Sequence, residues 1–312
     1  MGLGKGTGSN YLTEMTLETA FAAYEAARGR LPAAGGTRGC TWHDTLDDIA
    51  DKFDVFLLDA FGVLNIGEQA IPGVPERVAR LQALGKRVFV VTNAAGYPNA
   101  SLQAKYARLG YEFAPENVIS SRMTILTALE REPKRHWGAM LSRASGMLDL
   151  EHLNLTHLEE DRAIYDAVDA FLLLGAAEWT AGRQALLEDA LIKRPRPVWV
   201  ANPDIVAPRE HGFSSEPGCF AHRLADRTGV SPVFFGKPFA NIYDLAFERL
   251  GSDVDRTRVV MVGDSLHTDV LGAQTAGISS ALIAGYGFFA GQSVEEPISA
   301  AGIQPDFILK RP

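Results

Sequence analysis

The sequence predicts an α/β protein: a parallel sheet with helices, into which a second, smaller α/β unit is inserted. Short apolar runs, each followed by a polar side chain and then by a helical pattern, are typical of buried parallel strands joined by crossover helices. Residues 55–58, which lead directly to Asp59, are the first such run. The pattern changes between about residues 122 and 228 and then resumes, which indicates an insertion.

This pattern divides the chain into an N-terminal helical extension (residues 1–50), a core (residues 51–122 and 229–312) and an inserted unit (residues 123–228). Helical spacing of apolar residues predicts a helix over residues 16–30, and the glycines after it predict a loop to residue 41. In the core we expect strands at residues 55–58, 87–91, 232–235, 258–262 and 280–283. Residues 305–309 are expected to add an edge strand.

Composition limits the classes of partner. The chain has 312 residues and a formal net charge of -8, which argues against a nucleic-acid binder because phosphate backbones require clustered basic residues. No apolar run approaches the ~20 residues that span a bilayer. Cys40 and Cys219 have neither disulfide-framework nor zinc-site spacing. Residues 1–9 lack an apolar signal core and are expected to be a flexible leader, with Met15 an alternative start, in a cytoplasmic protein.

Polar residues at predicted strand ends indicate the chemistry. Asp59 can act as a nucleophile that forms a covalent aspartyl ester, or it is a turn or helix-cap residue. Thr92 and Asn93 end the next strand, where a hydroxyl and a backbone N–H can hold a phosphate oxygen; the alternative is a helix cap. Lys237 lies between Gly236 and Pro238 and can neutralise an attacking carboxylate and a transferring phosphoryl group; otherwise it is a solvated lysine.

Two further acids predict a metal site. Asp264 follows the strand at residues 258–262, and Asp269 stands five residues later at the start of a helix. Both can face the sheet edge that carries Asp59, where three carboxylates would repel one another without a cation. Hard oxygen ligands favour Mg²⁺, so we predict Mg²⁺ as the cofactor; the alternative is a capped strand–helix turn.

In this order, Asp59, Thr92-Asn93, Gly236-Lys237-Pro238 and Gly263-Asp264 with Asp269, the motifs resemble those of the haloacid dehalogenase (HAD) superfamily. The long insertion resembles that of class IIA, which has a large α/β C2-type cap domain and includes NagD-type, 4-nitrophenyl and pyridoxal phosphate phosphatases. The resemblance covers about residues 54–284. It implies a Rossmann-like core, a substrate-selecting cap at residues 123–228 and, by analogy, a homodimer formed through the cap.

The resemblance also implies residue roles. Asp59 is implied to be the nucleophile, Thr92 a phosphate ligand and Lys237 the charge stabiliser. Mg²⁺ is implied to bind Asp59, Asp264 and the backbone carbonyl of Phe61, with Asp269 on or near its water shell. Residues 201–204, Ala-Asn-Pro-Asp, resemble a cap motif close to the substrate, although an ordinary turn is the alternative. Substrate contacts are therefore expected from Asn202, Asp204 and His211.

Phe61 departs from the family pattern, which usually has an aspartate two residues after the nucleophile as general acid and base. A phenylalanine can offer its carbonyl oxygen to a metal but cannot carry a proton. Histidine titrates near neutrality, so His267 is one candidate for the missing proton donor. The other candidates are Asp204, His211 and Glu216.

The sequence thus predicts a hydrolase of phosphoric monoesters that acts on a small sugar or aryl phosphate through an aspartyl-phosphate intermediate. Phe61 leaves two alternatives open. One is a metal-independent dehalogenase-like hydrolase of carbon–halogen bonds, and the other is a catalytically weakened ligand-binding protein on the same scaffold. The substrate is a small phosphorylated metabolite in the first case, with neither nucleic acid nor a membrane as partner.

Overall fold

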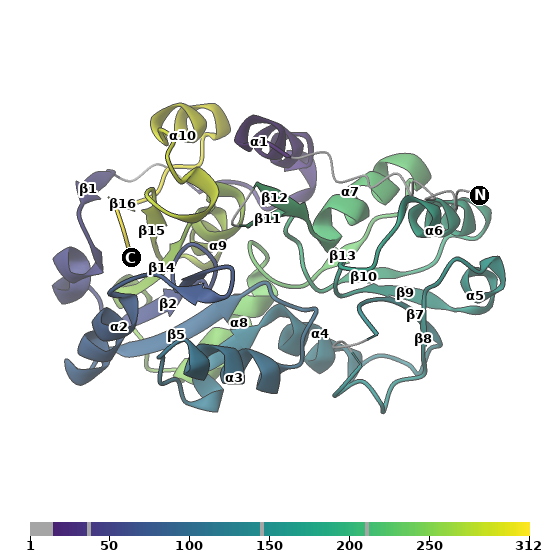
Figure 1. Cartoon of the computed structure of the whole chain (residues 1–312), viewed down its shortest axis with the longest axis horizontal. Helices are drawn as coiled ribbons and strands as arrows, with labels where there is room; N and C mark the ends of the chain where they lie inside the picture. Colours follow the sequence, from purple (N-terminus) through teal and green to yellow (C-terminus); the bar gives the residue numbers. More distant parts are fainter. Residues whose placement is uncertain (1–14, 36–38, 144–146, 210–211) are drawn as a thin grey trace, which may run out of the picture.

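The computed structural model describes residues 15–35, 39–143, 147–209 and 212–312 of the chain. Two parallel sheets organise these residues and lie side by side in Figure 1. We call them the large sheet and the small sheet. Their strands alternate with helices along the chain, which confirms the predicted α/β fold class.

The large sheet has seven strands in the described chain, and all neighbouring strands are parallel. In spatial order they are β1 (Thr41–His43), β16 (Phe307–Leu309), β15 (Ser279–Ile283), β14 (Val259–Gly263), β2 (Val55–Leu58), β5 (Arg87–Thr92) and β6 (Val118–Ser120). Since β2 lies between β14 and β5, the strand ends that carry the predicted site residues are direct neighbours.

Helices cover both faces of this sheet, as the fully buried strand β2 requires. Phe56 and Leu58 pack in the cluster that includes residues of α2, whereas Val55 and Leu57 pack in the cluster that includes residues of α8. This alternation follows from the two-residue period of a strand. The helices around the large sheet are α2 (Val74–Ala83), α3 (Asn99–Arg108), α4 (Ser121–Leu129), α8 (Ala240–Leu250), α9 (Leu271–Ala276) and α10 (Glu295–Ala301).

Two predictions about the large sheet are wrong. Residues 305–309 do not form its edge, because β16 lies between β15 and β1. The edge strand on this side is β1, whose first residue, Thr41, ends the segment predicted to be a loop. Three residues of a strand leave too short a pattern to read, and the pairing of β1 with β16 joins opposite ends of the chain.

The small sheet is also parallel. Its order is β13 (Val233–Phe234), β10 (Val198–Val200), β9 (Ala170–Leu173), β7 (Trp137–Met140) and β8 (Leu155–His157). The expectation that residues 232–235 return to the core is therefore wrong. Phe234 pairs with Val200, and the N–H of Phe235 donates to the carbonyl of Val200 at 2.8 Å. The chain returns to the large sheet only after this strand.

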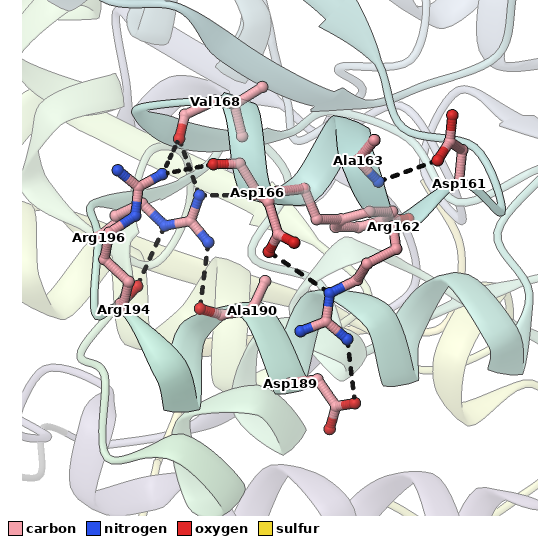
Figure 2. Close-up of polar contacts among 10 residues, drawn as sticks. Asp161, Arg162, Ala163, Asp166, Val168, Asp189, Ala190, Arg194 and Arg196 are labelled. Atoms are coloured by element: carbon pink, nitrogen blue, oxygen red, sulfur yellow. Dashed lines mark hydrogen bonds and ion pairs between the residues drawn. The ribbon is translucent and has the colours of Figure 1, made fainter.

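Helices α5 (Arg162–Ala167), α6 (Ala181–Lys193) and α7 (Pro217–Thr228) accompany the small sheet. Figure 2 shows the polar contacts that Arg196 makes near the C-terminal ends of α5 and α6. Its guanidinium group donates to the carbonyl oxygens of Tyr165 and Val168 at 2.6 and 2.8 Å and to that of Ala190 at 3.1 Å, and it stacks over the Phe171 ring. These carbonyls lie at the C-terminal ends of α5 and α6, where that of Ala190 also accepts the N–H of Arg194 at 3.0 Å, so the buried cation stabilises both helix ends.

A hairpin of β11 (Val206–Pro208) and β12 (Phe213–Ser215) lies between the two sheets, and α1 (Leu17–Ala26) lies beside it in Figure 1. Ala20 and Tyr24 of α1 pack in one cluster with Ile205 and with Leu266, which follows β14. The predicted N-terminal helix therefore contacts both units. A second small hairpin joins β3 (Asn65–Ile66) and β4 (Gln69–Ala70). Within the described residues, no helix is both long and apolar enough to cross a membrane.

Candidate active site

The strand ends of the large sheet bring three acids and one lysine together. Asp59 follows β2, and its N–H donates to the carbonyl of Val262 in β14 at 2.8 Å. The ammonium group of Lys237 lies 2.7 Å from Asp59 Oδ1 and 2.6 Å from Asp269 Oδ1. Carboxylate oxygens of Asp59, Asp264 and Asp269 all lie within 4.8 Å of one another. The structure therefore confirms the prediction from the sequence that these four side chains lie together.

Asn93 holds Lys237 in place through the backbone. Its Oδ1 accepts the N–H of Lys237 at 2.7 Å, and its Nδ2 donates to the Lys237 carbonyl at 2.9 Å. Asn93 comes from the end of β5 and Lys237 from the segment after β13, so this pair of bonds ties two distant parts of the chain. Lys237 is 1% exposed, which shows that it is not a solvated lysine.

The acids are held by backbone donors as well. Asp269 lies in a π-helical turn, Leu266–Val270, and its Oδ2 accepts the N–H groups of Asp264 and Ser265, both at 3.1 Å. Asp264 Oδ2 accepts the N–H of Phe288 at 2.8 Å. Such bonds fix the direction of each carboxylate, so the oxygens remaining at the sheet edge are oriented before any ligand arrives.

Close packing at this edge requires glycine. Gly62 has φ +72°, and a Cβ there would lie 2.5 Å from Asp264 Oδ2. At Gly263 a Cβ would lie 1.9 Å from Asp269 Cγ. Because real Cβ atoms do not approach other atoms so closely, any side chain at either position would displace a carboxylate.

Burial and charge shift the pKa values in this cluster. Burial raises the pKa of Asp59 to about 6, with Lys237 opposing and Asp269 adding to the rise. Burial raises the pKa of Asp264 well above its usual range, and Asp269 and Asp59 raise it further. For Lys237, burial alone would lower the pKa, but Asp269 and Asp59 outweigh it and raise the pKa above its ordinary value. A single ammonium group thus faces three acids, which leaves room for one more positive charge.

This donor set fits a hard divalent cation such as Mg²⁺, because its side-chain donors are all carboxylate oxygens. The backbone at Phe61 is compatible with its expected role. Asn65 bridges to this segment by donating to the carbonyl of Ala60 and accepting the N–H of Gly62, so the bridge does not use the Phe61 carbonyl oxygen. Asp269, with contacts to Lys237 and two backbone N–H groups, fits a place beside the metal's water shell.

A cavity of about 750 Å³ opens onto Asp59 between the large sheet and the hairpin of β11 and β12. Its lining includes residues from both units, which fits a site closed by the inserted unit. From the large sheet and α3 come Asp59, Phe61, Thr92, Asn93, Tyr97, Lys105 and Tyr106, and from the inserted unit come Ser142, Asn202, Asp204, Arg209, Ser214 and Glu216.

Two of the three predicted substrate contacts from the inserted unit line this cavity. Asn202 donates to Glu216 Oε2 at 3.2 Å and accepts the N–H of Asp204 at 3.0 Å. Asp204 Oδ1 accepts Nδ2 of Asn93 at 2.7 Å, which joins the two units directly at the site. The third predicted contact, His211, lies outside the described residues.

The structure places His267 elsewhere, which contradicts its expected role as proton donor. It is 1% exposed, does not line the cavity and donates Nε2–H to Glu25 Oε1 at 2.5 Å. Its ring stacks on Tyr24 of α1 at 4.9 Å between centroids. Burial lowers its pKa, although Glu25 opposes this. Proximity to Asp264 in sequence was misleading, because His267 packs against α1 whereas Asp264 lies with Asp59 and Asp269 at the sheet edge.

Sequence reasoning missed several residues of the cavity, of which Arg209 and Tyr106 contact residues of the predicted site. Arg209 lies over the Phe61 ring, 5.7 Å from its centroid, and pairs with Glu216 at 3.0 Å. Tyr106 of α3 lines the cavity near Thr92. Its helical spacing with Leu102 matches an ordinary core position, so the sequence held no signal for Tyr106. Arg209 follows Asp204 by five residues, and this closeness to the Asn-Pro-Asp motif was the available signal.

Comparisons with known proteins show which family this chain resembles. A model described as haloacid dehalogenase-like hydrolase matches residues 56–152, and a HAD-hydrolase-like model matches residues 234–311. A glycerol-3-phosphate phosphatase from Gallus gallus is 28% identical over 271 residues, which are 80% of this chain and 86% of the relative.

Solved structures show the same fold. One, described as a possible sugar phosphatase of the HAD superfamily from Cytophaga hutchinsonii, has a TM-score of 0.75 and 24% identity and covers 88% of this chain and 98% of its own. A glycerol phosphate phosphatase from Mycobacterium tuberculosis, solved with calcium, has a TM-score of 0.65 and 24% identity, covering 84% and 74%. With both family models on the parts of the chain that carry the site, the protein belongs to the haloacid dehalogenase-like hydrolases.

Proposed function

We propose that the protein is a Mg²⁺-dependent phosphatase that hydrolyses a small phosphorylated metabolite through a phosphorylated Asp59. The observation that carries this proposal is the position of Lys237 between Asp269 and Asp59, of which Asp59 lines the cavity. The phosphatase names of the relatives support the reaction class, and the calcium in one of the solved structures supports a divalent cation.

Each residue has a task in this reaction. An oxygen of Asp59 attacks phosphorus, while Lys237 neutralises negative charge on the attacking carboxylate and on the phosphoryl group. The hydroxyl of Thr92 and the backbone N–H beside it orient a phosphoryl oxygen, and Asn93 keeps Lys237 in place. A divalent cation held by Asp59, Asp264 and the Phe61 carbonyl would supply further charge neutralisation, with Asp269 beside its water shell.

The inserted unit, with Asn202 and Asp204 at the cavity, is proposed to select the substrate and exclude water. Polar groups from both units line the cavity, which suits a sugar or polyol phosphate; the name of the avian relative points to the same class. A homodimer through the inserted unit and a cytoplasmic location stay predictions from the sequence.

The test is phosphate release from a panel of sugar, glycerol and aryl phosphates, with Mg²⁺ and with EDTA. We expect turnover that requires the metal and that Asp59→Asn abolishes, since an amide is a poor nucleophile toward phosphorus. Full activity in Asp59→Asn would overturn the proposal. Halide release from 2-haloacids in EDTA would instead favour the dehalogenase alternative that Phe61 raises.

A further inference from the structure

We propose that Asp204, contributed by the inserted unit, donates and then accepts the proton of the phosphoryl transfer in place of the residue at position 61. This inference deepens the function proposed above and rests on it. It explains how a site with phenylalanine two residues after the nucleophile can still release a poor leaving group.

Phe61 cannot do this task, and its surroundings are not those of a proton carrier. Its ring lines the cavity under the guanidinium group of Arg209, which lies 5.7 Å from the ring centroid. The ring is therefore part of the wall of the cavity. A proton for the leaving oxygen has to come from another group that reaches the same space.

Asp204 reaches that space and is linked to the nucleophile by three short contacts. Its Oδ1 accepts Nδ2 of Asn93 at 2.7 Å, and the same Nδ2 donates to the carbonyl of Lys237 at 2.9 Å. The ammonium group of Lys237 lies 2.7 Å from Asp59 Oδ1. Both carboxyl groups line the cavity. Within the described residues, no hydrogen bond or ion pair holds the second oxygen of Asp204, Oδ2, so it is free for a ligand.

The loop that carries Asp204 is firmly packed. A Cβ at Gly236 would lie 3.0 Å from Cδ of Pro203, and a Cβ at Gly218 would lie 2.1 Å from the Pro203 carbonyl oxygen. On the other side, the N–H of Ile205 donates to the hydroxyl of Tyr24 at 3.1 Å. A proton donor must keep its place relative to the reacting oxygen, and these contacts hold Asp204 from both neighbouring residues.

The environment of Asp204 favours the protonated form. Burial raises its pKa to about 8; Asn93 and Lys237 oppose the rise, and Asp59 and Asp269 add to it. Tyr24, on α1, also faces it; burial raises the pKa of that tyrosine, and ionised Asp204 would raise it further. At neutral pH the carboxyl group therefore carries a proton that it can give and take back.

Glu216, another partly buried acid that lines the cavity, lacks a free oxygen. Its Oε1 accepts from Arg209 at 3.0 Å and from Ser214 at 2.8 Å, and its Oε2 accepts from Asn202 at 3.2 Å. These contacts give it a structural role in holding the Asn-Pro-Asp loop. Glu216 is therefore the matched control for Asp204.

Asp204 gives up its proton in the first step of the reaction and regains one in the second. As an Asp59 oxygen bonds to phosphorus and the bond from phosphorus to the ester oxygen breaks, that oxygen takes the proton of Asp204 and leaves as an alcohol. Asp204 is then a carboxylate. It takes a proton from the water that attacks the phosphorylated Asp59, phosphate leaves, and both carboxyl groups return to their starting states.

The experiment compares Asp204→Asn with the parent protein and with Glu216→Gln, with Mg²⁺, over phosphate monoesters whose leaving alcohols range from glycerol to 4-nitrophenol. Asparagine can still accept the hydrogen bond from Asn93 but carries no transferable proton. We expect kcat/KM of Asp204→Asn to fall by about 100-fold or more for glycerol phosphate and by less than about 10-fold for 4-nitrophenyl phosphate. Glu216→Gln should affect all substrates alike.

An equal loss for all leaving groups in Asp204→Asn, or no loss, would overturn the inference. The parent protein provides a second measurement that does not depend on the variant folding. Its kcat/KM for glycerol phosphate should decline above about pH 8, where the acid form is lost, and the value for 4-nitrophenyl phosphate should not. Identical profiles for the two substrates would also contradict the role. Asp59→Asn separates the two proposals, because its full activity would remove the proposed function itself.

Discussion

At the scale of single residues, the site depends on close contacts of its carboxylates with one buried ammonium group and with the backbone. Lys237 is the clearest case. Its side chain is fully surrounded, and its charge is matched by Asp59 and Asp269 on either side. Removing one partner of a buried ion pair leaves an uncompensated charge, so this residue cannot be exchanged for an apolar one without disturbing the acids.

Gly62 offers a test of this close approach. Gly62→Ala should destabilise the protein by more than about 2 kcal/mol, because its φ of +72° costs alanine about 1–2 kcal/mol and the new Cβ would also strike Asp264. Gly73→Ala is the matched control, since φ there is +80° and, among the described residues, no atom beyond its chain neighbours would lie within 4 Å of the added Cβ. Urea unfolding measures both.

Metal affinity separates the two variants further. Gly62→Ala should weaken Mg²⁺ binding in a calorimetric titration, and Gly73→Ala should leave it as in the parent protein. Equal free energies of unfolding and equal affinities in the two variants would show that Asp264 has more freedom than the packing at Gly62 indicates.

At the scale of elements, α1 connects the two units. Its Tyr24 accepts the N–H of Ile205, next to Asp204, and its Glu25 pairs with His267 next to the metal-site acids. Arg30, after the helix, pairs with Asp226 of α7. The extension at the N-terminus thus supports the loop that carries the proposed proton donor.

Tyr24→Phe tests this support. The substitution leaves the buried N–H of Ile205 without its acceptor, which should lower the free energy of unfolding by about 1–3 kcal/mol. Tyr111→Phe is the control, because its hydroxyl donates to the Leu64 carbonyl at 2.6 Å inside the core. Hydrogen exchange should show faster exchange of the Ile205 amide in Tyr24→Phe, beyond any global change. Similar exchange at Ile205 in both variants would contradict the supporting role of α1.

His222 of α7 makes the inserted unit sensitive to acid. The ring is buried against Phe234, neither ring nitrogen has a partner within the described residues, and burial lowers its pKa to about 4. Arg30 adds to this shift and Asp226 opposes it. The unfolded chain therefore binds a proton at this histidine more readily than the folded chain does. The contribution of neutral His222 to the free energy of unfolding is fully present above about pH 6.5 and is lost as the pH falls toward 4, by on the order of 3 kcal/mol.

The measurement is the pH dependence of urea unfolding between pH 7 and pH 4. His222→Phe keeps an aromatic ring against Phe234 and should make this dependence shallower. His152→Gln, at a position outside the buried core, should not. A parallel decline of stability in the parent protein and in both variants would assign the acid sensitivity to other groups.

At the scale of the whole molecule, metal binding and folding are linked. The acids of the metal site come from the ends of β2 and β14 and from the turn after β14, and they meet only in the folded chain. A ligand that binds only the folded state stabilises it, by about 2.7 kcal/mol at 100 times its Kd. Mg²⁺ should therefore raise the unfolding temperature of the large-sheet unit.

Asp264→Asn should lose most of that stabilisation, because it removes a carboxylate from the cluster. Asp161→Asn is the control: Asp161 caps α5 in the inserted unit, and asparagine caps helices equally well. Scanning calorimetry with Mg²⁺ or EDTA gives both values. A Mg²⁺ effect as large in Asp264→Asn as in the parent protein would place the metal elsewhere.

The amino-acid sequence by itself determined the α/β class and the residues at the ends of β2, β5 and β14. Apolar strands followed by a polar residue are local patterns, and parallel strands bring their carboxyl ends to one edge. Asp59, Thr92 and Asp264 could be predicted for this reason. Lys237 could be predicted from the motif around it and from its order in the chain.

Only the tertiary structure decided what depends on contacts between distant segments. The pairing of β13 with β10, the place of β16 inside the large sheet and the contact of His267 with α1 join parts of the chain that no short pattern relates. The bond from Asn93 to Asp204 spans 111 residues. It is this packing of the inserted unit against the strand ends, rather than any motif, that gives Asp204 its burial and its access to the cavity.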